Sequence, residues 1–121
     1  MDVFDAFPRS ISTNWEIGVV QRATEQGDVY TALGKLEAIQ SVGRGAELHN
    51  SPNAAAASST ILLYVRPETL PTDDVAELTA AYVVKDAKGR SFDIIDASWG
   101  FNQETGELEH IELELNPTEV I

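Results

Sequence analysis

The most regular pattern in the sequence, and the one that decides the fold, is the alternation Glu107-Leu108-Glu109-His110-Ile111-Glu112-Leu113-Glu114-Leu115. Ile111, Leu113 and Leu115 occupy every second position, and the residues between them are glutamates. Successive side chains of a β-strand point to opposite faces, so this pattern predicts a strand with one apolar face and one acidic face. Asn116-Pro117 then predicts the end of the strand, because proline has no backbone N–H to donate to a ladder.

Six further segments have strand character. Residues 15–22 alternate between apolar and polar side chains, and residues 59–65 are an apolar run that is typical of a central strand. The others are residues 29–32, 35–42, 79–85 and 91–99. Residues 35–42 also have helical propensity, but Leu36 and Ala38 share one parity, which favours a strand.

Turns with glycine separate these segments, at Gly27, Gly89 and Gly106. Residues 68–77 contain Pro71 and four acidic residues, and we expect an acidic loop there. Short strands at close spacing predict a mainly β fold with six or seven strands, either a small antiparallel barrel or a sandwich. The length of 121 residues suits a single domain.

The longest interruption of the strand pattern is a long loop at residues 43–58. Gly43, Gly45 and Pro52 break any strand there, and alanines occupy residues 54–57. A helical turn through these alanines would bury almost no apolar surface. A connection of this length is typically either a functional loop or a disordered excursion, and the sequence leaves both interpretations open.

The chain is strongly acidic, with a net charge of −12 from 20 Asp and Glu against 8 Lys and Arg. Residues 61–121 hold thirteen of the acids and residues 1–60 hold seven, while each half has four bases. Binding to the DNA backbone is not expected, because that affinity comes from Lys and Arg that displace counterions. For an isolated domain, the simplest interpretation of the acidic strand is a solvated face that aids solubility.

Other classes of protein are also disfavoured. The chain has no cysteine, which excludes disulfides and cysteine-ligated zinc. The first residues are acidic and contain no apolar run, so they predict neither a secretory signal nor a membrane span. We therefore expect no membrane partner and an intracellular location when the protein is made.

Catalytic and metal-binding patterns are sparse. His110 shares a strand face with Glu112 and Glu114, a spacing that suits metal ligation, although an exposed strand face explains it as well. The second histidine, His49, lies in the long loop beside polar turn residues. Neither a phosphate-binding glycine loop nor a nucleophile elbow is present. We therefore expect no enzyme activity, no cofactor and no metal.

The order of the features resembles a known family of phage proteins. The features, in chain order, are Gly27-Asp28-Val29-Tyr30, Gly43-Arg44-Gly45-Ala46-Glu47, Thr60-Ile61-Leu62-Leu63-Tyr64-Val65-Arg66-Pro67, Tyr82-Val83-Val84-Lys85-Asp86, Gly89-Arg90-Ser91-Phe92-Asp93-Ile94, Trp99-Gly100 and the final Leu/Glu strand. They span residues 15–117 and are similar to the head–tail joining proteins of long-tailed bacteriophages, in the head-closure or stopper family.

This resemblance implies a small β-barrel with one long loop and an extended N-terminal arm at residues 1–12. It also implies a virion protein of the phage neck, made in the host cytoplasm. Copies would form a dodecameric ring on the portal and adaptor ring, retain packaged DNA and provide the docking surface for the tail terminator or tail tube protein. Phage DNA would pass through this ring without specific binding.

The resemblance also implies roles for three groups of residues. The long loop would either gate the channel or clasp the adjacent subunit, through Gly43, Arg44, Gly45, Glu47, His49 and Asn50. An acidic channel or ring-interface face would comprise Glu68, Asp73, Asp74, Glu112 and Glu114, since acidic walls repel phosphates. The N-terminal arm would dock on a neighbouring ring through Val3, Phe4, Phe7 and Ile11, because this segment is too short to make a core of its own.

Other functions stay open from the sequence. A tail terminator, another small phage ring or an unrelated β-barrel interaction module would show the same strands and acidity. An enzyme or metal-binding domain is the third class, and it would depend on His110.

Overall fold

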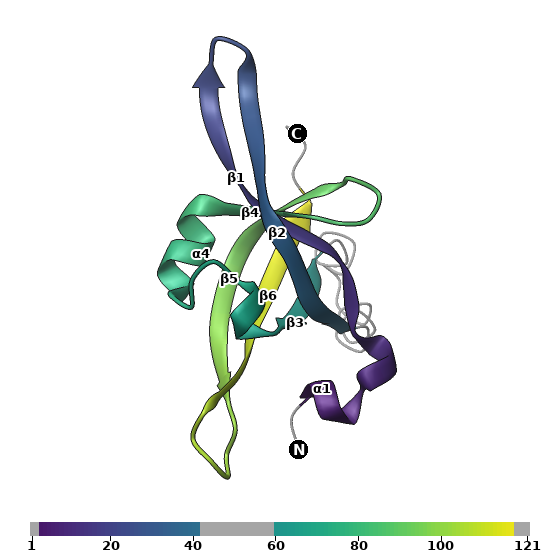
Figure 1. Ribbon diagram of the computed structural model, residues 1–121. Helices are drawn as coiled ribbons and strands as arrows, with labels where there is room; N and C mark the ends of the chain where they lie inside the picture. Colours follow the sequence, from purple (N-terminus) through teal and green to yellow (C-terminus); the bar gives the residue numbers. More distant parts are fainter. Residues whose placement is uncertain (1–2, 42–59, 118–121) are drawn as a thin grey trace, which may run out of the picture.

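The computed structural model describes residues 3–41 and 60–117, and its centre is a closed antiparallel barrel of six strands (Figure 1). The strands are β1 (Ser12–Thr24), β2 (Gly27–Ser41), β3 (Ile61–Val65), β4 (Tyr82–Lys85), β5 (Ser91–Phe101) and β6 (Leu108–Pro117). Around the barrel they follow the order β1-β2-β3-β6-β5-β4, and β1 pairs with β4 to close it. The prediction of a mainly β fold with a small antiparallel barrel is confirmed.

Strand β6 carries the alternation on which the fold was predicted, and it has neighbours on both sides. Its inward residues Ile111, Leu113 and Leu115 are all 0% exposed. Leu113 lies opposite Leu63 of β3 and opposite Ala97 of β5. The two faces predicted for this strand are therefore confirmed, with the apolar one inside the barrel.

The core collects side chains from all six strands. Its buried members are Trp15, Ile17, Leu36, Ala38, Leu63, Val65, Leu70, Leu78, Val84, Phe92, Ile94, Ile111, Leu113 and Leu115. Burial of apolar surface on this scale is the main favourable contribution to folding of a small domain.

Strands β1 and β2 extend beyond the barrel as a two-stranded ribbon (Figure 1). β1 pairs with β4 only over residues 16–19, and β2 pairs with β3 only over residues 38–41. We call residues 20–33 the ribbon. Gly27 adopts a φ of 88° at its tip, which confirms the predicted turn. The sequence predicted two strands in this region, at residues 29–32 and 35–42, but β2 is continuous through Gly34. The barrel therefore has six strands, within the six or seven that were predicted.

The segment between β3 and β4 differs from its prediction. A 3-10 helix, η2 (Pro67–Thr69), is followed by α4 (Val75–Ala81), where we expected an acidic loop and the start of a strand. The Asp74 carboxylate caps α4 by accepting hydrogen bonds from the N–H groups of Ala76 and Glu77 at 3.0 and 3.3 Å. Leu78 on this helix is 0% exposed and belongs to the barrel core. The Asp74 cap and the buried Leu78 therefore stabilise a helix that the periodicity of the sequence does not predict.

The N-terminal segment is not an extended arm. It forms α1 (Val3–Ala6) and the 3-10 helix η1 (Pro8–Ser10), and Phe4 is only 1% exposed. The Arg66 guanidinium lies 4.3 Å from the centre of the Phe4 ring, an attractive cation–π contact. Phe4 is thus packed within its own chain, although the resemblance implied that it docks on a neighbouring ring.

The inward orientation of β6 can be tested by mutation. Leu113→Ala is expected to lower the free energy of unfolding by about 3–4 kcal/mol, because removal of a buried leucine leaves a cavity in the barrel. Urea denaturation measures this loss. Glu112→Ala is the control, since Glu112 points to the opposite face, and we expect a change below about 1 kcal/mol. Equal losses in the two variants would contradict the orientation of the strand.

Candidate functional site

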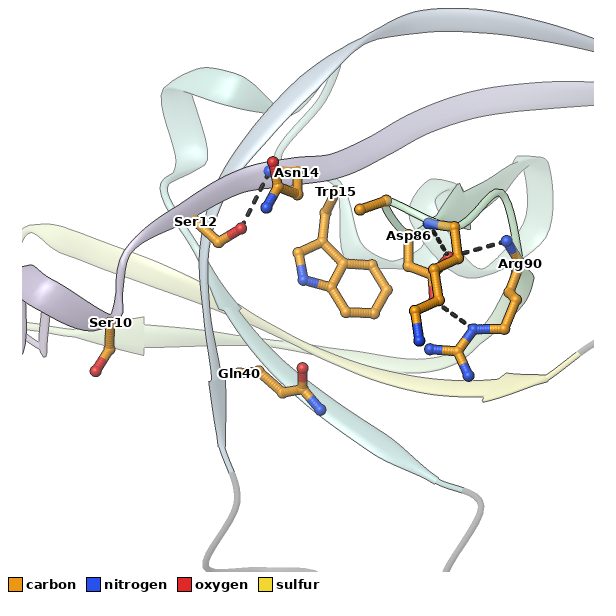
Figure 2. A pocket seen from close by; sticks show the side chains of 9 residues that line it. Ser10, Ser12, Asn14, Trp15, Gln40, Asp86 and Arg90 are labelled. Carbon is orange, nitrogen blue, oxygen red and sulfur yellow. Dashed lines mark hydrogen bonds and ion pairs between the residues drawn. The ribbon is translucent and has the colours of Figure 1, made fainter.

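The first candidate site is a hollow at one end of the barrel, where the start of β1, the end of β2 and the β4–β5 turn meet (Figure 2). Its volume is about 340 Å³. The lining residues are Ser10, Ser12, Asn14, Trp15, Gln40, Asp86, Ala87, Lys88 and Arg90. Trp15 is the largest of these side chains, and its ring is held in the core by a tilted contact with Phe92 at 5.5 Å between ring centroids.

Asp86 organises the turn that borders the hollow. Its Oδ1 accepts hydrogen bonds from the N–H groups of Lys88 and Arg90 at 3.0 and 2.9 Å, and its Oδ2 lies 2.6 Å from Arg90 Nε. Burial raises the pKa of the Asp86 carboxyl, but the hydrogen bonds from Arg90 and Lys88 and the Arg90 charge lower it more, so the net pKa lies below its ordinary value of 3.8. The carboxylate is therefore a fixed structural anion of the turn.

The chemistry of the hollow suits binding more than catalysis. Its polar groups are hydroxyls, amides, the Lys88 ammonium and the paired Asp86 and Arg90. A serine needs an adjacent base to become a nucleophile, and no histidine lines this hollow. The hollow can offer hydrogen bonds and one cation to a polar segment of a partner.

The second candidate site is an acidic face on the outside of β5 and β6. Glu112 lies between Tyr64 of β3 and Ser98 of β5, and Glu114 lies opposite Asp96. Two carboxylates directly opposite each other on one face of a sheet repel. We call Asp96, Glu112 and Glu114 the acidic face; two of its members were predicted and Asp96 was not.

The other predicted acidic residues lie elsewhere. Glu68 is exposed on η2. Asp74 is occupied as the cap of α4, and the backbone carbonyl of Asp73 accepts a hydrogen bond from Trp99 Nε1 at 2.8 Å. Strand pairing therefore does not connect these three residues with the acidic face, although the resemblance implied one face for all five.

His110 packs on the outer surface of the barrel. Its ring covers Gly100, where a Cβ atom would collide with the imidazole, and it meets Tyr64 edge-on with 5.2 Å between ring centroids. Nδ1 of His110 lies 3.1 Å from Oε1 of Glu109, which also accepts a hydrogen bond from the Val3 N–H at 3.1 Å. His110 thus has a packing role beside the N-terminal segment. Within residues 3–41 and 60–117, no group of three or more His, Asp or Glu side chains is placed to hold a metal ion.

The four residues of the predicted docking arm differ in how far they are buried. Phe4 is buried, Val3 and Ile11 are half-buried, and Phe7 is 57% exposed. Docking through this segment stays a prediction, and it now depends chiefly on Phe7. The predicted loop residues Gly43, Arg44, Gly45, Glu47, His49 and Asn50 all lie outside the described residues.

Comparison of the chain with protein-family models, with curated proteins and with solved structures found no match. None of the helices in the described part of the chain has the length and apolar character needed to cross a membrane.

Several surface features were missed from the sequence. The hollow brings together polar residues that are more than 70 positions apart, such as Ser12 and Arg90, and no local pattern connects them. Trp99 and Phe101 are half exposed at the end of β5. The pairing of Asp96 with Glu114 depends on the β5–β6 register, which the sequence does not show.

The lowered pKa of Asp86 predicts how the stability of the protein depends on pH. A carboxyl with a folded-state pKa below its unfolded value stabilises the folded protein above about pH 4, and this contribution disappears as the pH falls below 3.8. Asp86→Asn is expected to lower stability by about 1 kcal/mol at pH 7 and by less at pH 2.5. Urea titrations at both pH values measure the difference.

Glu104→Gln is the control for this experiment, because it removes one exposed carboxylate outside the turn at Asp86. A loss for Asp86→Asn that is the same at both pH values would contradict the stabilising role of the ionised carboxylate.

Proposed function

We propose that this chain is a structural protein of the neck of a long-tailed bacteriophage. In this proposal, copies form a dodecameric stopper ring between the portal and adaptor ring and the tail. The ring retains packaged DNA in the head and offers a docking surface to the tail terminator or tail tube protein. The protein has no enzymatic role and works in the virion after synthesis in the host cytoplasm.

The architecture supports this proposal. The resemblance in the order of motifs implies a small barrel, and a closed six-strand barrel is what the chain forms. The ribbon and the β5–β6 turn project from opposite ends of this barrel (Figure 1). Projecting elements of this kind are suited to contacts between subunits in a ring, because heterologous contacts join two different surfaces of the same chain.

The observation that carries the proposal is the acidic face. Glu114 and Asp96 stand opposite each other, and the strand neighbours of Glu112 are Tyr64 and Ser98, so no basic residue is paired with these carboxylates across the sheet. A wall of this charge repels DNA phosphates over a distance of about 8–10 Å at moderate ionic strength. We propose that this face lines the channel, where it keeps DNA from adhering while it passes.

The N-terminal segment supplies the contact with the ring above. Phe7 is exposed on the N-terminal segment, and the buried Phe4 anchors this segment to the barrel. An aromatic side chain on an anchored segment is a suitable docking element, since little conformational entropy is lost when it is buried.

Disruption of the gene followed by electron microscopy of the particles tests the function. The stopper proposal predicts heads that have packaged DNA, lose it and carry no tails. Full heads beside tails of uncontrolled length would contradict it and indicate a tail terminator. Normal tailed particles would contradict any role in the neck.

The proposed channel lining can be tested by charge reversal. Glu112→Lys together with Glu114→Lys is expected to slow DNA ejection at least roughly tenfold, because added cations attract phosphates that the native face repels. The rate of dye uptake by released DNA measures ejection from purified particles.

The matched control is Glu104→Lys with Glu107→Lys, which makes the same change in net charge on the exposed β5–β6 turn. Equal slowing by both pairs would show that total charge matters and would contradict a lining role for the acidic face.

A further inference from the structure

The hollow at the end of the barrel has a local surplus of positive charge. Lys88 and Arg90 are cations and Asp86 is the one carboxylate among the described residues that line it, which leaves a local net charge of +1. Asp86 is already occupied by the N–H groups of its own turn and by Arg90 Nε. The Lys88 ammonium is therefore the unbalanced charge of this hollow, on a chain whose total charge is −12.

One hydrogen-bond donor of the hollow belongs to a side chain that is almost fully buried. Trp15 is 7% exposed, and it lines the hollow. Its indole nitrogen lies on the side of the ring that is turned toward Ser12 and Gln40, away from Asp86 and Arg90 (Figure 2). Among residues 3–41 and 60–117, no acceptor pairs with this N–H group. Buried indole N–H groups usually have a partner, so this donor is available to a ligand.

Neutral donors from two paired strands surround this indole. The Ser12 hydroxyl oxygen accepts a hydrogen bond from the Asn14 N–H at 3.1 Å. A hydroxyl group also carries a hydrogen, so Ser12 can donate to a ligand while its oxygen is held in place. The exposed amide of Gln40 adds two N–H donors from β2. Because β1 and β2 pair here, with Ser12 opposite Ala38, these donors keep their spacing without a ligand, which reduces the entropy lost on binding.

This set of groups selects the chemistry of the ligand. A carboxylate matches the Lys88 ammonium, and neutral carbonyl oxygens match the indole, hydroxyl and amide donors. An acidic peptide carries both kinds of acceptor along one chain. The volume of about 340 Å³ lies within the range of ligand pockets, and a single small anion would use only the charged end of it.

We propose that the hollow binds an acidic peptide segment of a partner protein. An Asp or Glu carboxylate of this segment pairs with Lys88 at the β4–β5 turn, and backbone carbonyls of the same segment accept hydrogen bonds from Trp15 and Gln40. This binding site goes beyond the proposed function and does not depend on it, because neither the acidic face nor the ribbon takes part.

The net charge of the chain makes this proposal unusually easy to test. A protein with a charge of −12 repels an acidic peptide at long range. Non-specific attraction therefore does not produce saturable binding of such a peptide, and short-range contacts in the hollow have to supply it. At about 0.15 M salt the long-range repulsion is largely screened, while close ion pairs are screened less.

NMR titration of the isotope-labelled full-length chain with acetyl-tetraglutamate amide tests the site. The chain has two tryptophans, so two indole N–H signals are expected, and Trp99→Phe identifies them by removing one. The Trp15 signal is expected to shift saturably, with a Kd of about 1 mM or tighter, while the Trp99 signal stays in place. Acetyl-tetraglutamine amide has the same length without the charge, and it is expected to bind at least roughly tenfold more weakly.

Substitution of the lysine tests the charged end of the hollow. Lys88→Gln is expected to weaken binding of the acidic peptide at least roughly threefold, because the carboxylate loses its cation. Gln103→Glu is the matched control, since it makes the same change in net charge at an exposed residue of the β5–β6 turn, at the other end of β5. It should bind the peptide as the wild type does. The other signals of the same spectra verify that each variant is folded.

Four results would overturn the proposal. The first is a Trp15 signal that does not shift saturably, and the second is equal affinity for the tetraglutamine peptide. The third is equal weakening by Lys88→Gln and Gln103→Glu, which would show that only the total charge matters. Inorganic phosphate is titrated as a further probe, and binding as tight as that of the peptide would show that the hollow holds an adventitious ion only.

Discussion

The constraint on which the structure depends is that β6 must pair along both of its edges while its inner side chains fill the barrel. Leu113 satisfies this at one position, opposite Leu63 on one side and Ala97 on the other. A slip of one residue would turn Glu112 and Glu114 into the core, which costs far more than any single lost contact. The register is therefore fixed on both sides, and the apolar core and acidic face follow from one alternation.

This constraint also explains how much could be predicted from the sequence. Alternation identifies β6 and the buried residues of β1 and β2, because regular ladders preserve parity. Bulges break that parity, and they depend on the partner strand more than on the local sequence. Leu33, Ile95 and Glu109 are each extra residues at such points. Leu33 and Ile95 are exposed, and Glu109 accepts the hydrogen bond from the Val3 N–H. The sequence thus predicted the core of the barrel, but it did not predict the side chains that face outward at the bulges.

The two helical segments also could not be predicted from the local sequence. Residues 75–81 contain Leu78 as their one fully buried side chain, so no apolar stripe indicates a helix there. The N-terminal segment is similar, because Phe4 is buried through Arg66, which lies more than 60 positions away in the sequence. Tertiary contacts decided these structures, and local patterns are a weak guide where a segment has only one anchor.

The distribution of charge over the barrel bears on how copies would meet in the proposed ring. Asp96, Glu112 and Glu114 make the outer face of β5 and β6 repulsive toward an identical face, so symmetric pairing of two such faces is disfavoured. The exposed large apolar side chains of the described residues are Phe7 on the N-terminal segment, Val29 and Leu33 on the ribbon, and Ile95, Trp99 and Phe101 on β5. In the proposed ring, contacts between unlike surfaces would keep the acidic faces of neighbouring copies apart. In a closed ring they would then point to a common side, which is the arrangement that a DNA channel requires.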